Sequence, residues 1–149
     1  MGVYVYCIKE DYQYQSSITG RQFKNEWFRL EPDGLIVVNG TNKRGYSWDG
    51  CSPKWKLGGM YFGTPEAVLN NTTLQSRTYY ASLIHDLFYQ YSSDVKDIVT
   101  RKEVDDEFYA LLKRDGFRMA PYYYRAVRMF GWIWWGKSRF VKRLFGRPQ

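Results

Sequence analysis

His85 is the only histidine among the 149 residues, and it lies in the apolar and aromatic stretch Ser82–Tyr89. Zinc proteases and HD-type phosphohydrolases both need two or more imidazoles at their sites, so this single count excludes both classes. What remains is either a site with one histidine and several carboxylates or a chain without a catalytic site.

Three aspartates are candidate partners of this imidazole: Asp49, Asp86 and Asp105. Adjacent residues on a helix point about 100° apart, so His85 and Asp86 cannot face the same point. We expect Asp86 to reach a neighbouring loop or helix N-terminus instead. Asp105 or Asp49 is better placed to orient the imidazole through one ring nitrogen.

Two kinds of chemistry follow if these side chains converge. Asp49, His85 and Asp105 together supply one imidazole and two carboxylates, a ligand set used by non-haem iron and manganese sites. Alternatively, His85 acts as general base for Ser52 or Cys51, with Asp105 fixing its tautomer. The identity of any metal stays open, and no cofactor is predicted.

A third interpretation needs no chemistry, and it is the one we favour. A lone histidine flanked by Ile84 and Leu87 is typical of a buried structural residue, whose hydrogen bonds join its helix to a neighbouring segment. Asp49, in a Trp-Asp-Gly turn, similarly fits a side chain that caps backbone amides. On this interpretation a loop is held against the helices by hydrogen bonds among four side chains: Asp49, Ser52, His85 and Asp105.

The first third of the chain has the signals of β-structure. Short β-branched or aromatic runs occupy 3–8, 27–30 and 35–38, and Pro32-Asp33-Gly34 is a tight-turn signature. We therefore expect a hairpin from Glu26 to Asn39. The glycine-rich stretch 39–63 is predicted to be mostly loop.

The second half has helical patterning. Large apolar residues recur at 3.6-residue spacing from Tyr80 to Tyr91, and Thr100-Arg101-Lys102-Glu103 is a capping box that begins a second helix. Asp115-Gly116 is expected to end that helix, and Ala120-Pro121 to open a third. The predicted fold class is α+β, with a small antiparallel sheet packed on a three-helix C-terminal half.

Four clusters carry a resemblance to a known family. They are Gly45-Tyr-Ser-Trp-Asp-Gly-Cys-Ser-Pro53, Ala81-Ser-Leu-Ile-His-Asp-Leu-Phe-Tyr89, Arg101-Lys-Glu-Val-Asp-Asp-Glu-Phe108 and Tyr123-Tyr-Arg-Ala-Val-Arg-Met-Phe-Gly131. In this order they resemble a phage-associated family known only as domain of unknown function 1353, over roughly residues 45 to 131. The resemblance places Asp49, Ser52, His85, Asp86 and Asp105 on the family's polar positions. It implies a phage or prophage origin and no established activity.

The basic charge points to the C-terminal quarter as a binding region, whereas the aromatic content has two interpretations. Aromatic residues make up 19% of the chain, and such side chains either form surfaces that bind something or build a small core from large rings. From Lys113 to Gln149 there are ten basic residues and one acidic residue, a net +9, whereas the overall charge is +7 and the preceding 112 residues therefore carry −2. Any anionic partner is expected at this end.

The segment from Trp132 to Arg147 interleaves large apolar and basic side chains. Its candidate binding residues are Trp132, Trp134, Trp135, Arg139, Lys142 and Arg143. Such a segment can lie on an anionic membrane surface, bind nucleic acid through phosphate contacts and ring stacking, or dock into another protein as an amphipathic anchor. The remaining alternative is that the tryptophans complete the domain's own core.

The resulting expectation is a single α+β domain over 1–136 followed by a basic amphipathic tail over 137–149. The N-terminus lacks the pattern of a signal peptide, and no apolar run is long enough to span a bilayer. We expect a phage virion or assembly component in a virion or the host cytoplasm. Its partners would be other phage structural proteins or further copies of itself, with nucleic acid or a membrane surface as alternatives. The competing hypothesis is a small hydrolase or metal-dependent enzyme centred on His85.

Overall fold

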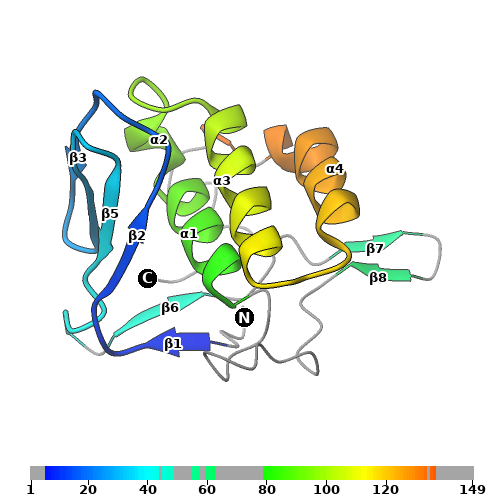
Figure 1. Cartoon of the computed structure of the whole chain (residues 1–149), viewed down its shortest axis with the longest axis horizontal. Helices are drawn as coiled ribbons and strands as arrows, with labels where there is room; N and C mark the ends of the chain where they lie inside the picture. The colour runs from blue at the N-terminus through cyan, green and yellow to red at the C-terminus, as the bar shows by residue number, and fades with distance from the viewer. Residues whose placement is uncertain are drawn as a thin grey trace.

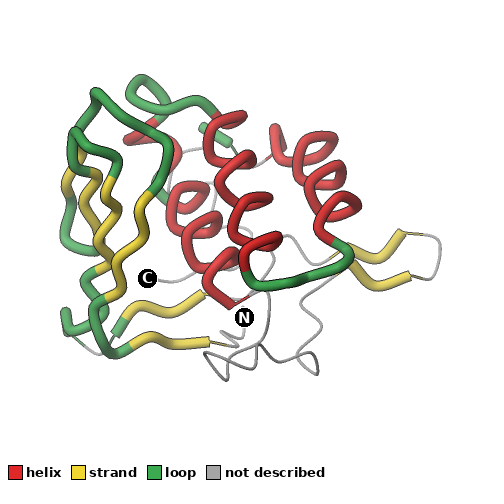
Figure 2. Tube along the Cα trace, viewed as in Figure 1, coloured by secondary structure: helices red, strands yellow, loops and turns green. Residues whose placement is uncertain are grey.

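The computed structural model describes residues 6–43, 45–48, 55–57, 60–62, 79–133 and 135–136. Within these ranges three helices stand side by side, and α3 lies between α1 and α4, with a sheet against α1 (Figure 1). Helices gather in the second half of the chain and strands in the first, as the tube view shows (Figure 2). The predicted α+β class is confirmed.

The largest sheet has four antiparallel strands in the order β2-β5-β4-β3. These strands are β2 (Tyr12–Gln15), β3 (Phe23–Lys24), β4 (Phe28–Leu30) and β5 (Leu35–Val38). Two further antiparallel pairs join β1 (Tyr6–Ile8) to β6 (Tyr46–Trp48) and β7 (Trp55–Leu57) to β8 (Met60–Phe62). Strands β6, β7 and β8 fall in the stretch that the sequence had indicated as loop.

The predicted hairpin is formed by β4 and β5. At its turn Gly34 has a φ of +92° and its amide donates to the Glu31 carbonyl over 2.9 Å. A Cβ on Gly34 would lie 2.6 Å from the Ser16 carbonyl oxygen, so both conformation and space require glycine here.

The helices are α1 (Tyr79–Gln90), α2 (Ser92–Val95), α3 (Arg101–Arg114) and α4 (Ala120–Phe130), followed by a 3₁₀ turn, η1 (Gly131–Ile133). The three long helices are the predicted ones, while α2 and η1 are short additions. None of the helices in the described ranges has the length and apolar character needed to cross a membrane.

Helix α1 is buried around most of its circumference, which the predicted one-sided stripe did not suggest. Eleven of its 12 residues are buried, His85, Asp86 and Gln90 among them. The reason is its position between the sheet and α3. Phe28 of β4 packs against Phe88 with ring centroids 5.1 Å apart, and Leu83 and Leu87 are fully buried. Polar side chains on such a helix need partners inside the protein.

A second set of polar contacts fastens the sheet region to α3. Glu107, only 4% exposed, accepts hydrogen bonds from the Tyr14 hydroxyl at 2.5 Å and from the Ser17 amide at 2.7 Å. Burial and the adjacent Glu107 carboxylate both raise the pKa of the Tyr14 phenol, which keeps it protonated as a donor. The edge strand β2 is therefore tied to α3 through side chains.

The predicted capping box at the start of α3 is confirmed. The Glu103 amide donates to the Thr100 hydroxyl at 3.2 Å, and the Thr100 amide donates to the Glu103 carboxylate at 2.8 Å. Arg21 adds an ion pair to the same carboxylate at 2.6 Å. Burial of Glu103 disfavours its charged form, but the hydrogen bonds from Arg21 and Thr100 outweigh that penalty and lower its pKa.

Because the pKa of Glu103 is lower in the folded state than in the unfolded chain, the stability it contributes is fully present above its ordinary value of 4.5. That contribution is lost as the pH falls through the lowered pKa. We expect Glu103→Gln, which keeps a capping-box side chain, to flatten the acid limb of the stability profile. Urea unfolding from about pH 3 to about pH 7 measures this. An acid limb as steep as that of the wild type would contradict it.

Candidate functional site

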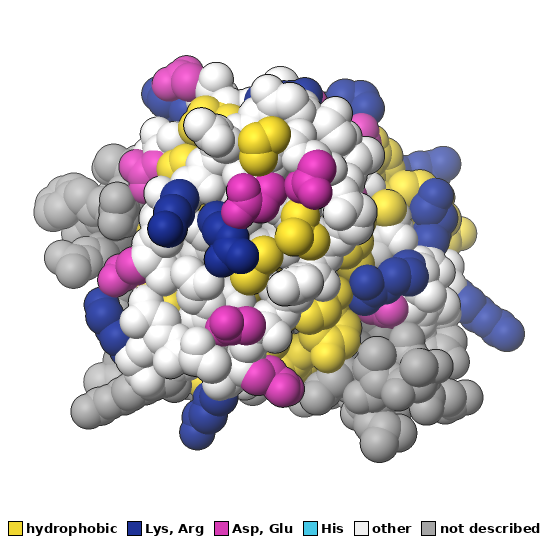
Figure 3. Space-filling view, turned by 60° about the vertical axis from the view of Figure 1, so that its left-hand side comes forward, with side chains coloured by type: hydrophobic (Ala, Val, Ile, Leu, Met, Phe, Trp, Pro, Cys, Tyr) yellow, Lys and Arg dark blue, Asp and Glu magenta, His cyan; other side chains and the backbone are white. Residues whose placement is uncertain are grey.

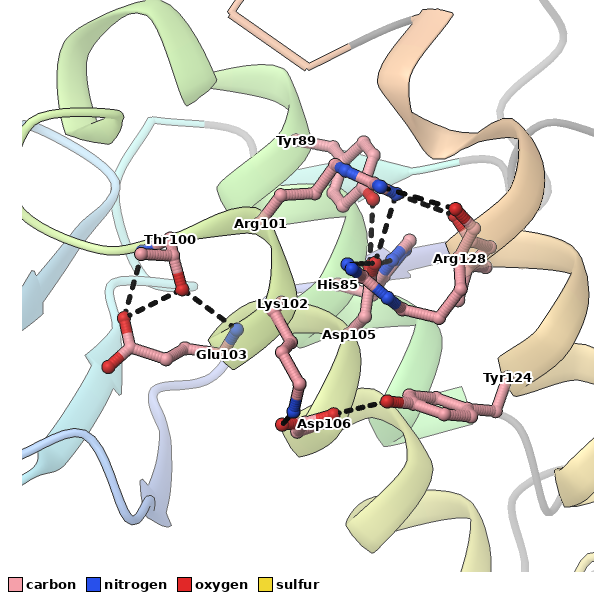
Figure 4. Close-up of polar contacts among 11 residues, drawn as sticks. His85, Tyr89, Thr100, Arg101, Lys102, Glu103, Asp105, Asp106, Tyr124 and Arg128 are labelled. Atoms are coloured by element: carbon pink, nitrogen blue, oxygen red, sulfur yellow. Dashed lines mark hydrogen bonds and ion pairs between the residues drawn. The ribbon is translucent and has the colours of Figure 1, made fainter.

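A buried carboxylate, Asp105, forms the centre of the polar contacts between the helices (Figure 4). Its Oδ1 lies 2.9 Å from His85 Nε2 and accepts a hydrogen bond from the Tyr89 hydroxyl at 2.7 Å. Its Oδ2 accepts hydrogen bonds from Arg128 Nη1 at 2.9 Å and Arg101 Nη1 at 3.3 Å. With 0% exposure and four partners, the carboxylate is fully satisfied inside the protein.

Helical spacing explains how three helices supply these groups. His85 and Tyr89 are four residues apart on α1, and Arg101 and Asp105 are four residues apart on α3, so each pair lies on one helix face. Arg128 comes from the last turn of α4. We call these five residues the Asp105 network. It joins α1, α3 and α4 at one point.

Arg101 also binds the C-terminal end of α4. Its Nη1 donates to the Val127 carbonyl at 2.9 Å, and its Nη2 donates to the Arg128 carbonyl at 3.2 Å. The Val127 carbonyl also accepts a hydrogen bond from the Gly131 amide, so Arg101 adds a second donor to it. Carbonyls at the C-terminal end of a helix carry a partial negative charge, which a guanidinium neutralises. Arg101 therefore holds α4 against α3 as well as neutralising Asp105.

The His85 ring is enclosed by aromatic side chains. It is 2% exposed, and its centroid lies 4.2 Å from that of Tyr89 and 4.5 Å from that of Phe108. Because Asp105 accepts from two guanidinium groups, it acts as a carboxylate and His85 Nε2 is assigned as a donor to it. Burial, followed by the Asp105 charge, raises the pKa of Tyr89, so that hydroxyl stays a donor too.

The His85–Asp105 contact is the pairing that a catalytic imidazole needs, but its surroundings suit a structural role. A general base must come within hydrogen-bond reach of the proton that it removes, and this ring is almost fully enclosed. Two arginines on the same carboxylate hold the imidazole in one orientation. In this conformation the arrangement orients and stabilises helices, with the imidazole buried among the side chains that it joins.

The structure places the predicted site residues in three groups. His85 and Asp105 are brought together, while Asp86 is buried on α1 and is not among the partners of Asp105. Asp49 and Ser52 lie outside the described residues, so the proposed metal set and the Ser52 nucleophile stay predictions. Across the described ranges, no group of three or more His, Cys, Asp or Glu side chains could hold a metal ion.

Three members of the network, Tyr89, Arg101 and Arg128, were not singled out from the sequence as site residues. The available signal was the four-residue spacing of His85 with Tyr89 and of Arg101 with Asp105. Arg128 carries no comparable local signal, because its partner is 23 positions away in the chain.

The predicted aromatic binding residues behave differently from one another. Trp132 is 64% exposed, whereas Trp135 is half-buried and packs edge-on against Tyr89, with centroids 5.3 Å apart. The Gly136 amide donates to the Ser92 hydroxyl at 3.0 Å, which holds the chain beside α2. The other candidates lie outside the described residues: Trp134, Arg139, Lys142 and Arg143.

The outer side of α4 and η1 exposes more large apolar surface than any other element whose side-chain burial the structure describes. Four side chains are between 47% and 64% exposed: Met119, Tyr122, Met129 and Trp132. We call them, together with the exposed Arg125 between them, the α4 surface. Between Phe117 and Gly136 the sequence has no acidic residue, whereas positive and negative side chains alternate over the face drawn in Figure 3.

Comparison with known proteins gives no relative. No protein-family model, curated protein or solved structure matches the chain. The resemblance to the phage-associated family therefore stays a prediction that rests on the four sequence clusters.

Proposed function

We propose that this chain is a phage-encoded virion or assembly component that works by binding protein through the α4 surface. The observation that carries this proposal is the exposure of Met119, Tyr122, Met129 and Trp132 along one segment. Protein interfaces are enriched in aromatic residues, methionine and arginine and depleted in lysine and acidic residues, which is the composition of this surface. Interface hot spots favour Trp, Tyr and Arg in particular.

The Asp105 network supports the same proposal, because it fixes the helix that carries the α4 surface. His85 and Asp105 are enclosed, and their contacts join three helices. Such a network gives α4 a fixed position, because Arg101 and Arg128 attach it to α3. A rigid helix with an exposed apolar face needs little ordering when it binds, which favours affinity. The phage setting rests on the sequence resemblance alone.

Photo-crosslinking in cells of the natural source tests this function. We expect a photoreactive residue in place of Met129 to give adducts of discrete mass that sediment with assembled particles. The same residue at Gln13, exposed on strand β2, is the matched control and should give none. Tyr122→Ala should leave thermal unfolding unchanged and weaken capture at least about 30-fold, as expected for a hot-spot residue. Equal labelling at Met129 and Gln13, or none at either, would reject the proposal.

A further inference from the structure

The spacing of the exposed apolar residues of the α4 surface is the same in both chain directions. The intervals between Met119, Tyr122, Met129 and Trp132 are three, seven and three residues, with a methionine and an aromatic residue in each outer pair. Residues seven apart on a helix lie on nearly the same face, so Tyr122 and Met129 point the same way.

This symmetry matters because a two-fold axis reverses the direction of a helix. When two α4 helices pack antiparallel about an axis between Arg125 and Ala126, Tyr122 of each copy meets Met129 of the other. Met119 of each copy then meets Trp132 of the other. All four contacts place a thioether against an aromatic ring, which is a favourable pairing. The small Ala126 side chain at the centre allows the helices to approach closely.

We propose that α4 and η1 pair antiparallel with the same segment of a second copy of this chain. This inference rests on the proposed function and names the partner of the same surface. An isologous contact of this kind uses one patch on both subunits, so the patch must be complementary to itself, and the Met–aromatic order satisfies that condition.

The area of the α4 surface indicates a weak and reversible dimer. An aromatic side chain has roughly 150–250 Å² to bury and a methionine somewhat less, so two of each, about half to two-thirds exposed, offer roughly 400–500 Å² in each copy. Two copies would bury about 1,000 Å² in total, which is near the lower bound for a specific interface. Dimer formation should therefore depend on protein concentration.

The charges on this surface give the dimer a distinctive salt dependence. Arg118 and Arg125 are exposed and make no ion pair within the part of the chain that the structure describes. Antiparallel packing brings Arg125 near Arg125 of the second copy, and salt screens this repulsion. The dimer should tighten as salt is added. An acidic protein or a nucleic acid on the same surface would instead bind more weakly in salt.

Sedimentation of the purified full chain over a range of protein and salt concentrations tests the pairing. We expect a monomer–dimer equilibrium that shifts toward dimer in salt. Met129→Lys should raise the dissociation constant at least tenfold, and Gln13→Lys should leave it unchanged. A monomer at every concentration, or a dimer that Met129→Lys leaves unchanged, would overturn the inference.

Cysteine crosslinking with a short bis-maleimide tests the direction, in a Cys7→Ser, Cys51→Ser background. A mixture of Arg118→Cys and Ile133→Cys chains should crosslink, because the same axis places these two positions opposite each other and leaves the four Met–aromatic contacts intact, whereas each variant alone should not. Crosslinking of Arg118→Cys with itself would mean parallel packing and overturn the antiparallel register. If the chain is monomeric but the residue at Met129 still captures a different protein in cells, this inference fails and the proposed function stands. If it is monomeric and captures nothing, both fail.

Discussion

Replacing Asp105 with asparagine is expected to lower the free energy of unfolding by about 3 kcal/mol, which is the low end of the range for breaking a buried ion pair. The change removes the negative charge that pairs directly with both Arg101 and Arg128, whose side chains are only 18% and 30% exposed. It also replaces one acceptor oxygen with an NH₂ group, which then faces hydrogen-bond donors instead of accepting from them. Chemical denaturation of the two proteins measures the difference.

Asp106→Asn is the matched control, because Asp106 is the next residue on the same helix. Its side chain is 42% exposed and pairs with Lys102 at 2.6 Å, and exposed pairs of this kind contribute between 0 and about 1 kcal/mol. A loss at Asp105 no larger than that at Asp106 would mean that the network does not hold the helices together.

A double-mutant cycle separates the charge pairing from the loss of packing. In an Arg128→Met background the second guanidinium is absent, so Asp105→Asn should cost clearly less than it does in the wild type. Equal costs in both backgrounds would contradict a coupling between the two side chains.

Local sequence signals predicted the features of the fold that depend on local chemistry. The Pro32-Asp33-Gly34 turn, the Thr100–Glu103 capping box and the proline in the first turn of α4 each act within a few residues. The sequence did not predict strand β6, because its partner β1 lies about 40 residues earlier in the chain. No local pattern in Tyr46–Trp48 indicates that pairing. The strong burial of α1 likewise depends on what packs on each side of it.

The sequence predicted only the part of the candidate site that depends on local helical spacing. Helical geometry excluded Asp86 as the partner of His85 and left Asp105 as a candidate, and the structure brings those two together. The two arginines decide what the pair does, because they engage the second carboxylate oxygen and the end of α4. Their contribution depends on where α4 packs, which no spacing in the sequence determines.

Gly131→Ala is expected to destabilise the protein by about 2–3 kcal/mol, although the backbone conformation at Gly131 does not require glycine. At Gly131 the φ of −59° is an ordinary right-handed value that any residue can adopt, so the backbone conformation alone does not disfavour alanine. The surroundings leave no room for an alanine side chain, because a Cβ on residue 131 would lie 2.3 Å from the Tyr89 hydroxyl oxygen and 2.9 Å from Arg101 Nη1. Overpacking of a well-packed site costs about 1–3 kcal/mol.

The clash falls on two donors of Asp105, so its cost includes their hydrogen bonds. If Tyr89 and Arg101 move away, the buried carboxylate loses two of its four partners, and each lost bond to a charged group costs about 1.5–3 kcal/mol. Thermal and urea unfolding of Gly131→Ala measure the net effect, and adding Tyr89→Phe, which removes the crowded hydroxyl, should recover part of the loss. A Gly131→Ala protein as stable as the wild type would mean that α4 can shift away from α1 without cost, and the Asp105 network would then not fix the position of the α4 surface.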